Sequence, residues 1–394
     1  MIKVGIIGAG SISRLHIEGY NTFPKLCKIT ALADIHPQDV QKRKKEYAFL
    51  EGAKEYASHI DMLNGSEVDL VSICTPPFTH AAIAVDCLNA GKNVLVEKPM
   101  AASLSECDLM LAAAKKSGRL LSSVAQNRFK DPILNLKRVL DSGAAGKVLH
   151  AQVDSHWWRG RSYYDLWWRG LWEKEGGGCT LNHAVHHIDM LGWMLGPPAS
   201  VTAVMSNAAH DNAEVEDVSI AIMSYGEGRG TAKGALAQVT SSVIHYGEEQ
   251  QLIFQCEKAR ISAPWKAASH VAQDNGFPDR SELSEPFIAE LNALYASFPP
   301  LDYTGHTGQV NDVLKAVEEK RPPFITGEDG RLTIELITSI YKAAIEGRRV
   351  SFPVNEGDSF YTARGIQSSA PRFHQKKSSA ESLDGKITTG ASYK

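Results

Sequence analysis

The chain has 394 residues, of which 43% are hydrophobic and 22% charged, and its net charge is −3. This composition is typical of a globular protein of two or three domains, and the slight negative charge argues against nucleic acid or an anionic membrane as a partner. The chain has no apolar run of the ~18 residues that span a membrane, no charged-then-apolar leader and six cysteines without disulfide or metal spacing, so we expect a cytoplasmic protein with reduced thiols.

The first expected strand, 2–7, is apolar and leads into the turn GAGSIS, from which a helix runs to about residue 20. Gly8 allows the sharp turn, Gly10 lets the backbone approach a ligand closely, and Ser13 is small enough for the third position. Backbone N–H groups and the positive end of the helix converge there, which favours a pyrophosphate. We therefore expect the turn to bind a dinucleotide through Gly8, Gly10, Ser11 and Ile12.

The second expected strand, 28–33, ends in Asp34. An acidic residue at this strand tip can accept hydrogen bonds from both ribose hydroxyls, and it repels a 2′-phosphate. The sequence therefore favours NAD over NADP. The alternative is an ordinary strand–helix–strand unit in which Asp34 is merely solvated.

Strands and helices continue to alternate up to residue 125. We expect strands at 68–74, 93–96 and 120–125, with helices at 81–90 and 104–117 between them. Near-continuous apolar strands separated by helices predict a doubly wound parallel sheet covered on both faces, with its ligand crevice at the carboxyl ends of the strands. Residues 1–125 are thus predicted to be a Rossmann dinucleotide-binding domain.

The pattern changes after about residue 127, where β-rich segments are separated by turn residues. Expected strands lie at 147–156, 200–205, 218–224, 231–240 and 251–256, a helical pattern at 181–195, and late helices at 308–319 and 329–346. We interpret 126–353 as an α+β domain with an open, largely antiparallel sheet that binds substrate and mediates oligomerisation. The remainder, 354–394, is a C-terminal extension, of which 367–394 is expected to be a mobile tail or a non-native appendage.

Lys98 follows the expected strand at 93–96 and lies at the carboxyl edge of the predicted sheet. Pro99 constrains its backbone towards an extended conformation, and the bond between them can be cis. A lysine there can donate to a substrate oxygen, or lose its proton when it is desolvated. The alternative is a surface lysine in a strand–helix loop.

The segment 175–189, EGGGCTLNHAVHHID, combines three glycines with the expected start of a helix near residue 180. On that helix Asn182, His186 and Asp189 would share one face. We predict that His186 is a general base or acid, because imidazole titrates near neutral pH, and that Asp189 orients it. The alternative is a helix whose histidines only make structural hydrogen bonds.

A second pair of histidines on the same segment, His183 and His187, has the spacing at which two side chains can bind zinc. The sequence places no third ligand beside them. We therefore predict no metal site.

The run 156–172, HWWRGRSYYDLWWRGLW, interleaves aromatic and basic residues. Aromatic faces stack on sugars and nicotinamide, and arginine holds phosphates, carboxylates or sulfonates through its planar fork. A packed interdomain loop is the alternative, and nucleic-acid binding is disfavoured by the net charge. From this run we assign to the substrate site Trp157, Arg159, Tyr163 and Tyr164.

Together, the segments 8–13, 74–99, 176–189 and 306–353, with Asp34, resemble the Gfo/Idh/MocA family of NAD(P)-dependent oxidoreductases over residues 1–353. The resemblance implies that Lys98 lies beside the nicotinamide, that His186 is the catalytic histidine and that the open sheet forms a homodimer or homotetramer. Our further assignments to the cofactor site are Thr75, Pro76, His80, Glu97, Lys98, Gln126, Trp168 and Arg169. Our further assignments to the substrate site are Lys98, Arg128, Asn182, His183 and His186.

The chain departs from the family pattern at two positions. Many relatives carry Asp where this chain has Asn182, and since an amide cannot take up a proton at neutral pH, a Lys–Asp–His proton relay is not available in that form. Pro77 replaces a frequent Asn, which removes one side-chain contact to the cofactor.

The leading hypothesis is an NAD-dependent dehydrogenase that oxidises a hydroxyl of a sugar, glycoside or cyclitol. The first alternative is an NAD-dependent glycoside hydrolase that works by transient oxidation, elimination, water addition and reduction. Its substrate would be an anionic sugar if Arg159, Arg161 and Arg169 form one pocket. The second alternative is a non-catalytic NAD-binding sensor.

Overall fold

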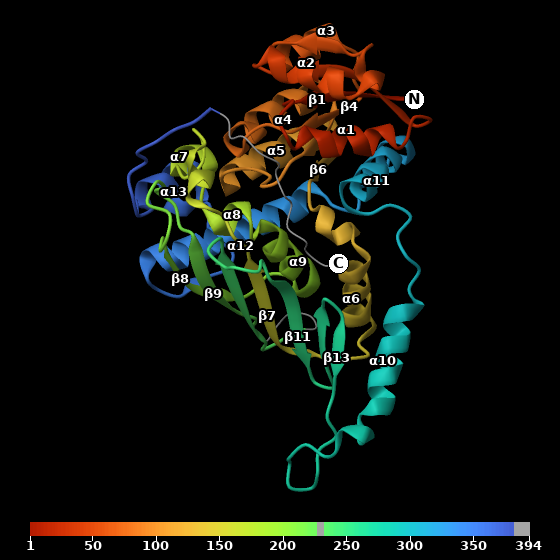
Figure 1. The fold of residues 1–394 in the computed structure, drawn as a ribbon, viewed down its shortest axis with the longest axis vertical. Coiled ribbons are helices and arrows are strands. Elements are labelled where there is room, and N and C mark those ends of the chain that lie inside the picture. Colours follow the sequence, from red (N-terminus) through yellow and green to blue (C-terminus); the bar gives the residue numbers. More distant parts are fainter. Residues whose placement is uncertain (227–231, 382–394) are drawn as a thin grey trace.

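The computed structural model describes residues 1–226 and 232–381 and contains two sheets stacked along the long axis of the molecule (Figure 1). The N-terminal sheet has six parallel strands in the order β3-β2-β1-β4-β5-β6. The strands are β1 (Ile2–Ile7), β2 (Cys27–Ala33), β3 (Lys54–Tyr56), β4 (Leu70–Ile73), β5 (Asn93–Val96) and β6 (Leu121–Ser123). The helices of this part are α1 (Ser13–Asn21), α2 (Pro37–Glu46), α3 (His59–Gly65), α4 (His80–Asn89) and α5 (Leu104–Ser117).

The predicted doubly wound parallel sheet is confirmed. Its central strands are apolar along their length, as in β4, whose four residues are all buried, because helices cover both faces. Two expected strands are shorter than predicted, since pairing stops at β4 Leu70–Ile73 and at β6 Leu121–Ser123. The short edge strand β3 and helices α2 and α3 were not predicted, because their sequences are polar and lack a clear period.

The C-terminal sheet has eight strands in the order β13-β12-β11-β7-β10-β9-β8-β14, and only the β7–β10 pair is parallel. The predicted open, largely antiparallel sheet is therefore confirmed. The strands are β7 (Val148–His156), β8 (Ser200–Ser206), β9 (Val218–Ser224), β10 (Leu236–Ser242), β11 (Gln250–Cys256), β12 (Arg260–Ala263), β13 (Lys266–Ala268) and β14 (Val350–Ser351). The strand expected at 231–240 begins only at Leu236, after a turn, and residue 231 lies outside the described residues.

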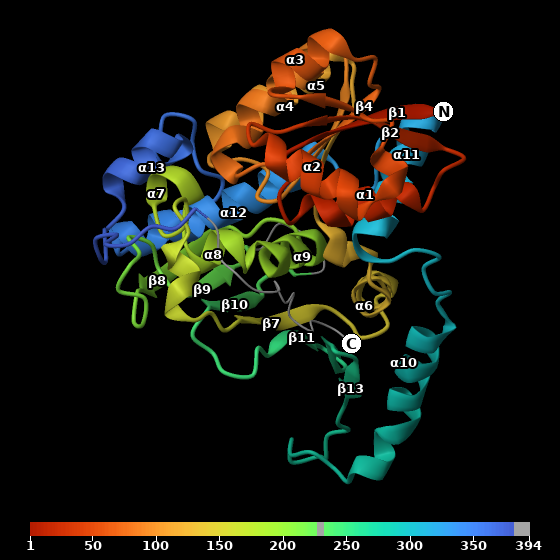
Figure 2. The same cartoon turned by 45° about the horizontal axis from the view of Figure 1, so that its top comes forward.

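Among the described residues, helices cover one face of this second sheet and leave the other without a helix (Figure 2). Figure 2 shows α8, α9 and α12 lying between the sheet and the N-terminal domain. The helices of this half are α6 (Asp131–Ser142), α7 (Trp172–Glu175), α8 (Cys179–Asn182), α9 (Val185–Leu195), α10 (Glu285–Ser297), α12 (Gly327–Glu346) and α13 (Ala363–Ser369). The segments that build the candidate site lie on the side of this helical layer nearest the N-terminal domain. They therefore face the carboxyl ends of the N-terminal strands (Figure 2).

One late helix, α11 (Gly305–Glu319), packs against α1 rather than against the second sheet (Figure 1). Its side chains Val310, Val313 and Leu314 join the hydrophobic core of the N-terminal sheet. The chain thus crosses back between the two halves, and the division at residue 125 stays a proposal.

The first part of the C-terminal extension packs against the body of the protein. Val354, Phe360, Tyr361 and Ile366 are buried in the main core, and α13 follows. The expectation of a mobile tail is wrong for residues 367–381, which make hydrogen bonds to the body of the protein. Residues 382–394 lie outside the described residues.

All six cysteines lie within the described residues, and each is buried and free of disulfides, as predicted. Within the described ranges, no helix has both the length and the apolar character that crossing a bilayer requires.

Candidate active site

The glycine turn after β1 has the geometry that the sequence predicts. Gly8 adopts φ +89°, and a Cβ there would lie 2.7 Å from the carbonyl of Cys74, so only glycine fits. At Gly10 an added Cβ would meet no atom within 4 Å, which leaves space beside the turn. The turn therefore offers backbone N–H groups to an open volume at the start of α1, as a pyrophosphate requires.

Asp34 lies directly beside this turn. Its Oδ2 accepts a hydrogen bond from the N–H of Ala9 at 2.6 Å, and its Oδ1 accepts one from the N–H of His36 at 2.8 Å. Each carboxylate oxygen keeps a further lone pair, with which it can accept a ribose hydroxyl. The negative charge at this position disfavours a 2′-phosphate.

A second observation fits a dinucleotide at the same edge of the sheet. The Oε1 of Gln126, which follows β6, is buried and has no hydrogen-bond partner among the described residues. An unpaired buried amide oxygen is costly, and such groups are usually satisfied by a partner. A bound carboxamide or hydroxyl donor would supply one, so the residues present fit the predicted NAD.

We expected His80 to contact the cofactor, but in the structure its ring contacts the backbone of the protein. Its ring is 1% exposed, and its two nitrogens lie 2.9 Å from the carbonyl oxygen of Pro99 and 2.8 Å from that of Thr75. Both ring nitrogens are thus occupied by the chain, and the side chain joins the end of β4 to the turn after β5. The Lys98–Pro99 bond in that turn is cis.

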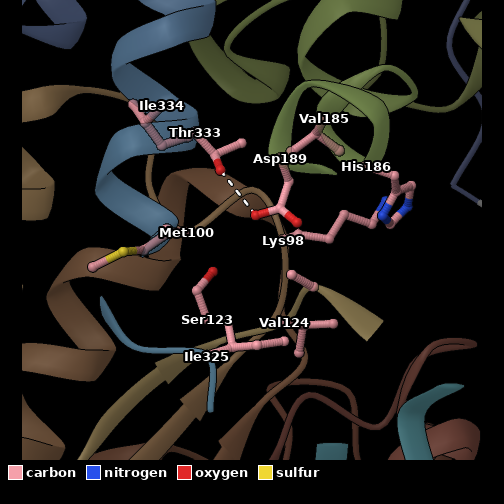
Figure 3. A pocket seen from close by; sticks show the side chains of 12 residues that line it. Lys98, Met100, Ser123, Val124, Val185, His186, Asp189, Ile325, Thr333 and Ile334 are labelled. Carbon is pink, nitrogen blue, oxygen red and sulfur yellow. Dashed lines mark hydrogen bonds between the residues drawn. The ribbon is translucent and has the colours of Figure 1, made fainter. Parts of the chain in front are cut away.

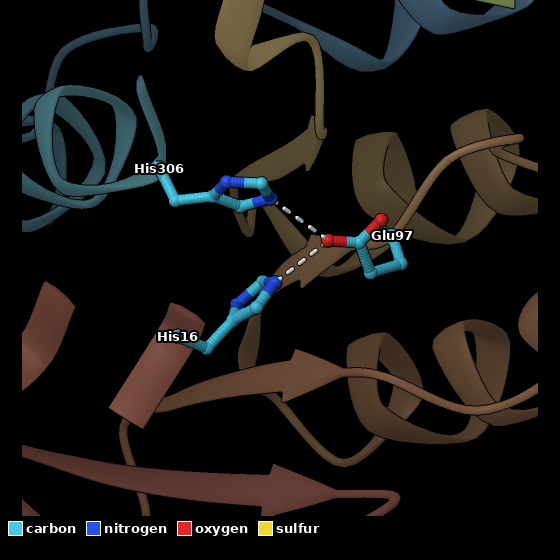
Figure 4. A group of neighbouring side chains, drawn as sticks. All are labelled: His16, Glu97 and His306. Atoms are coloured by element: carbon cyan, nitrogen blue, oxygen red, sulfur yellow. Dashed lines mark hydrogen bonds and ion pairs between the residues drawn. The ribbon is translucent and has the colours of Figure 1, made fainter. Parts of the chain in front are cut away.

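Glu97 is also held by the chain, in a cluster with His16 and His306 (Figure 4). Its Oε1 accepts hydrogen bonds from Nε2 of His16 at 2.9 Å and Nε2 of His306 at 3.3 Å, while its Oε2 accepts the backbone N–H of Lys98 at 3.0 Å. Burial raises the pKa of Glu97, but the two histidines outweigh it and hold that pKa well below its usual range. The carboxylate therefore fixes the backbone of Lys98.

The same three side chains have the spacing of metal ligands, with their ligand atoms within 4.8 Å of one another. In the described parts of the chain, no other such group of histidine, cysteine, aspartate and glutamate side chains occurs. Hydrogen bonds already pair the facing atoms of His16, Glu97 and His306, so we interpret the group as a buried polar network. The predicted absence of a metal remains a prediction.

The structure brings Lys98 and His186 together from the two halves of the molecule. Figure 3 shows the Lys98 side chain extending towards the imidazole of His186 on α9. The Nζ of Lys98 donates to the carbonyl oxygen of Asn182 at 3.3 Å. The pocket behind the pair is lined by Lys98, Met100, Ser123, Val124, Ala125, Val185, His186, Asp189, Ile325, Gly330, Thr333 and Ile334.

The surroundings of the pair lower the pKa of both side chains. Burial lowers the pKa of Lys98, and Arg169 and Arg159 lower it further against the opposing effect of Glu97. Burial and then the Lys98 ammonium keep the pKa of His186 well below its usual value. His186 is therefore a neutral imidazole beside a cation, which suits a general base.

The helical pattern at 181–195 is broken, contrary to the prediction. Helix α8 ends at Asn182 and α9 begins at Val185, so Asn182 and His186 do not share one helix. The Nδ2 of Asn182 instead donates to the carbonyl oxygen of Gly177 at 2.9 Å. The glycines set this path, because a Cβ at Gly178 would lie 1.9 Å from the carbonyl oxygen of Glu216.

Two predicted roles are wrong because Arg128 and Asp189 bind each other. Arg128 is 2% exposed and donates to Asp189 through Nε at 2.9 Å and Nη2 at 2.7 Å, with a third bond from Nη1 to Asp329 at 2.9 Å. Asp189 also accepts from the hydroxyl of Thr333 (Figure 3). Asp189 therefore does not orient His186, and Arg128 has no free donor fork for a substrate.

The aromatic–basic run forms a loop over the site, which we call the substrate loop (residues 161–169). The hydroxyl of Tyr163 lies 3.4 Å from Nε2 of His183. The Arg169 guanidinium stacks between the rings of Tyr163 and Trp168, 4.1 Å from each centroid, and its Nη1 bonds Glu175 at 2.7 Å. The loop thus places a cation and a phenol beside His183, which lies between α8 and α9.

Other residues of the run make contacts of their own within the protein. Tyr164 is 1% exposed and packs in the main core, and its expected contact with substrate stays a prediction. Trp157 is buried, and its indole N–H donates to the Ser155 hydroxyl at 3.0 Å. Arg159 lies 5.4 Å from the Trp157 ring centroid and bonds Glu248 at 2.6 Å.

Sequence reasoning missed several residues that build the site. His16 and His306 gave no signal, because each is a single histidine on an ordinary helix. Glu216 is fully buried and accepts the backbone N–H groups of Gly178 and Thr180, both at 3.0 Å, which fixes the glycine turn. Glu216 stands in an acidic stretch, Glu214 to Asp217, before an expected strand, and nothing in the sequence singles it out.

Two family models match the chain. One, described as an oxidoreductase family with an NAD-binding Rossmann fold, matches residues 2–125, and the GFO/IDH/MocA C-terminal domain matches residues 133–262. The myo-inositol 2-dehydrogenase of Thermotoga maritima is 23% identical over 353 residues, which are 89% of this chain and 98% of that protein.

Solved structures agree with this assignment. The WlbA dehydrogenase from Bordetella pertussis, in complex with NADH and UDP-GlcNAcA, is 26% identical with a TM-score of 0.75, over 90% of this chain and 98% of that one. A levoglucosan dehydrogenase in complex with NADH and levoglucosan is 20% identical, covers 90% of this chain and 100% of that one, and shares the fold with a TM-score of 0.73.

Proposed function

We propose, since the chain belongs to the Gfo/Idh/MocA family of NAD-binding oxidoreductases, that it is an NAD-dependent dehydrogenase acting on a hydroxyl of a sugar or cyclitol. The observation that carries the proposal is the meeting of Lys98 and His186 beside the carboxyl edge of the Rossmann sheet. The related dehydrogenases of inositol and of levoglucosan support this class of substrate.

In this proposal the chain's own groups bind, orient and deprotonate the substrate. The neutral Nε2 or Nδ1 of His186 takes the hydroxyl proton, and the Lys98 ammonium stabilises the developing alkoxide. The carbonyl of Asn182 and the carboxylate of Glu97 hold Lys98 in place from either side. NAD, held by the glycine turn, Asp34 and Gln126, would accept the hydride when bound.

A specific cluster supports an anionic substrate. Arg159, Arg169 and Lys98 all act on His183, whose pKa is kept well below its usual value, first by burial and then by these cations. Each arginine has one carboxylate partner, and the buried Nε of Arg169 has no hydrogen-bond partner within the described residues. A carboxylate or sulfonate on the sugar would complete this group.

The test is a panel of polyols, aldoses, uronates and nitrophenyl glycosides, incubated with NAD while NADH formation is followed. We expect NADH from at least one polyol or sugar. Release of nitrophenol without net NADH would instead identify the redox-neutral glycoside hydrolase. Tight NADH binding with turnover of no compound would favour a sensor and contradict the proposal.

A second copy of this chain is the proposed partner. The face of the C-terminal sheet away from the helices exposes apolar side chains, and on its neighbouring strands β8 and β9 Val204 is 65% exposed and its cross-strand partner Ile220 is 48% exposed. Contiguous exposed apolar surface of this kind marks an interface. We propose a homodimer or homotetramer formed through this face, in the cytoplasm.

A further inference from the structure

The segment 371–381, which follows α13 and which we call the strap, lies along the substrate loop. The N–H of Ala380 donates to the carbonyl oxygen of Asp165 at 2.6 Å, and the N–H of Trp167 donates to the carbonyl oxygen of Ala380 at 2.9 Å. Leu166 and Ala380 therefore form a parallel β-bridge. In Figure 1 this end of the described chain, in dark blue, runs past α7, which directly follows the loop.

Lys376 of the strap joins two points of the substrate loop. Its Nζ donates to the carbonyl oxygen of Tyr164 at 2.5 Å and to that of Arg169 at 3.0 Å. Burial lowers the pKa of Lys376, and the nearby Asp165 and Glu175 oppose this lowering. One side chain thus bridges Tyr164 and Arg169, which are five positions apart in the sequence.

Asn212, in the turn between β8 and β9, holds the strap and the loop together. Its Oδ1 accepts the N–H groups of Lys377 at 2.5 Å and Ser378 at 3.0 Å, and its Nδ2 donates to the Asp165 carboxylate at 2.8 Å. The hydroxyl of Ser378 also donates to Asp165 at 2.8 Å. The strap is therefore tied at several successive residues, and the tie reaches the substrate loop directly.

The side chains that the loop presents to the site depend on its path. Tyr163, whose hydroxyl lies 3.4 Å from His183, directly precedes Tyr164, whose carbonyl Lys376 binds. Arg169, which stacks on Tyr163, itself carries the second carbonyl that Lys376 binds. A loop released from the strap would keep its core anchor, because Tyr164 is buried, but would lose the fixed direction of these two side chains.

We propose that the strap is a positioning element of the substrate site and that Lys376 is its positioning residue. This inference rests on the proposed function in one respect, namely that Tyr163 and Arg169 contact the substrate. Lys376 touches neither substrate nor cofactor; it acts by fixing the loop that carries those side chains. Loss of the ammonium should weaken substrate binding and leave the cofactor site unchanged.

The variant Lys376→Met keeps the length of the side chain and removes its charge. Lys377→Met is the matched control, because Lys377 is exposed and lies 3.7 Å from an exposed Asp211 carboxylate. In full-length protein, amide hydrogen exchange of residues 161–169 is measured by mass spectrometry, together with the NADH dissociation constant. For the best substrate of the panel, KM and kcat are measured as well.

We expect Lys376→Met to speed exchange of the loop amides at least tenfold and to raise KM about tenfold, with kcat and NADH affinity within twofold of wild type. Lys377→Met should change none of these, and Lys376→Arg should restore most of the protection. Unchanged loop exchange in Lys376→Met overturns the proposal whatever the enzyme's activity, and faster exchange with unchanged KM reduces the strap to a structural role. If Lys376→Met does not fold, Ala380→Pro, which removes one strap donor, is judged by the same criteria.

Discussion

Replacement of Arg128 by methionine separates a structural role from a substrate contact. The guanidinium makes two hydrogen bonds to Asp189 and one to Asp329, and it lies 5.2 Å from the Trp193 ring centroid. Asp329 keeps the N–H and hydroxyl of Thr326 as partners, so most of the cost falls on the buried Asp189. Removing one partner of a buried ion pair, which leaves the other charge buried and unpaired, lowers the free energy of unfolding by about 3–5 kcal/mol.

This cost can be measured as a shift in Tm. With an unfolding entropy of roughly 2.1 cal/mol/K per residue, a chain of 394 residues that unfolds as one unit loses about 4–6 °C in Tm. Differential scanning calorimetry of Arg128→Met gives the shift, and NADH affinity should stay unchanged. Because Asp189→Asn removes the stranded charge, the double variant should recover at least half of the loss.

The opposite result would refute this reasoning. If Arg128→Met melts within 1 °C of wild type and raises KM for the substrate, the arginine contacts substrate, as the sequence alone suggested. If the double variant is less stable than the single one, the cost does not arise from the unpaired Asp189 carboxylate.

Three further predictions follow from the site and the open sheet. Gly10→Ala should leave Tm unchanged, because its Cβ enters only open space, but should weaken NADH binding measured by fluorescence. Gly8→Ala should lower both Tm and NADH affinity, because its Cβ meets Cys74 at 2.7 Å. Equal losses of Tm in the two variants would contradict this. As pH falls through 6.5, kcat/KM for oxidation should stay level, because burial and Lys98 keep the pKa of His186 well below 6.5. As pH rises, kcat/KM should begin to fall before pH 10.5 is reached, because burial lowers the pKa of the Lys98 ammonium. A protonation step near pH 6.5 would contradict the lowered pKa of His186. Ile222→Lys on the exposed sheet face should reduce the mass measured by light scattering to that of one chain, and an unchanged oligomer would exclude this face.

Local patterns in the sequence were enough to predict the Rossmann half and the glycine turn. Strand β1, Gly8 and Asp34 form one continuous segment of strand, turn, helix and strand, so their relation in space follows from neighbouring residues. The position of Lys98 at the edge of the sheet could also be predicted, because parallel strands bring their carboxyl ends to one edge.

Contacts between distant segments were beyond such reasoning. Asp189 was expected to orient His186 from one turn away, but Arg128, 61 residues earlier in the chain, binds it instead. The close packing of Gly178 against Glu216, which places the start of α8, is a contact that no helical period reveals. The strap was missed because Lys376 and its neighbours bind backbone and side-chain oxygens, and such contacts leave no apolar pattern.

The most direct measurement is single-turnover transfer of deuterium from a panel substrate, labelled at the carbon that bears the reacting hydroxyl, to bound NAD. The wild-type protein should give deuterated NADH, while Lys98→Met and His186→Asn should each slow the transfer by about 10²-fold or more, with NADH dissociation constants within threefold of wild type. Transfer at the wild-type rate in both variants, or no transfer from any labelled compound, would show that an ammonium and an imidazole meeting across the two halves do not perform this oxidation.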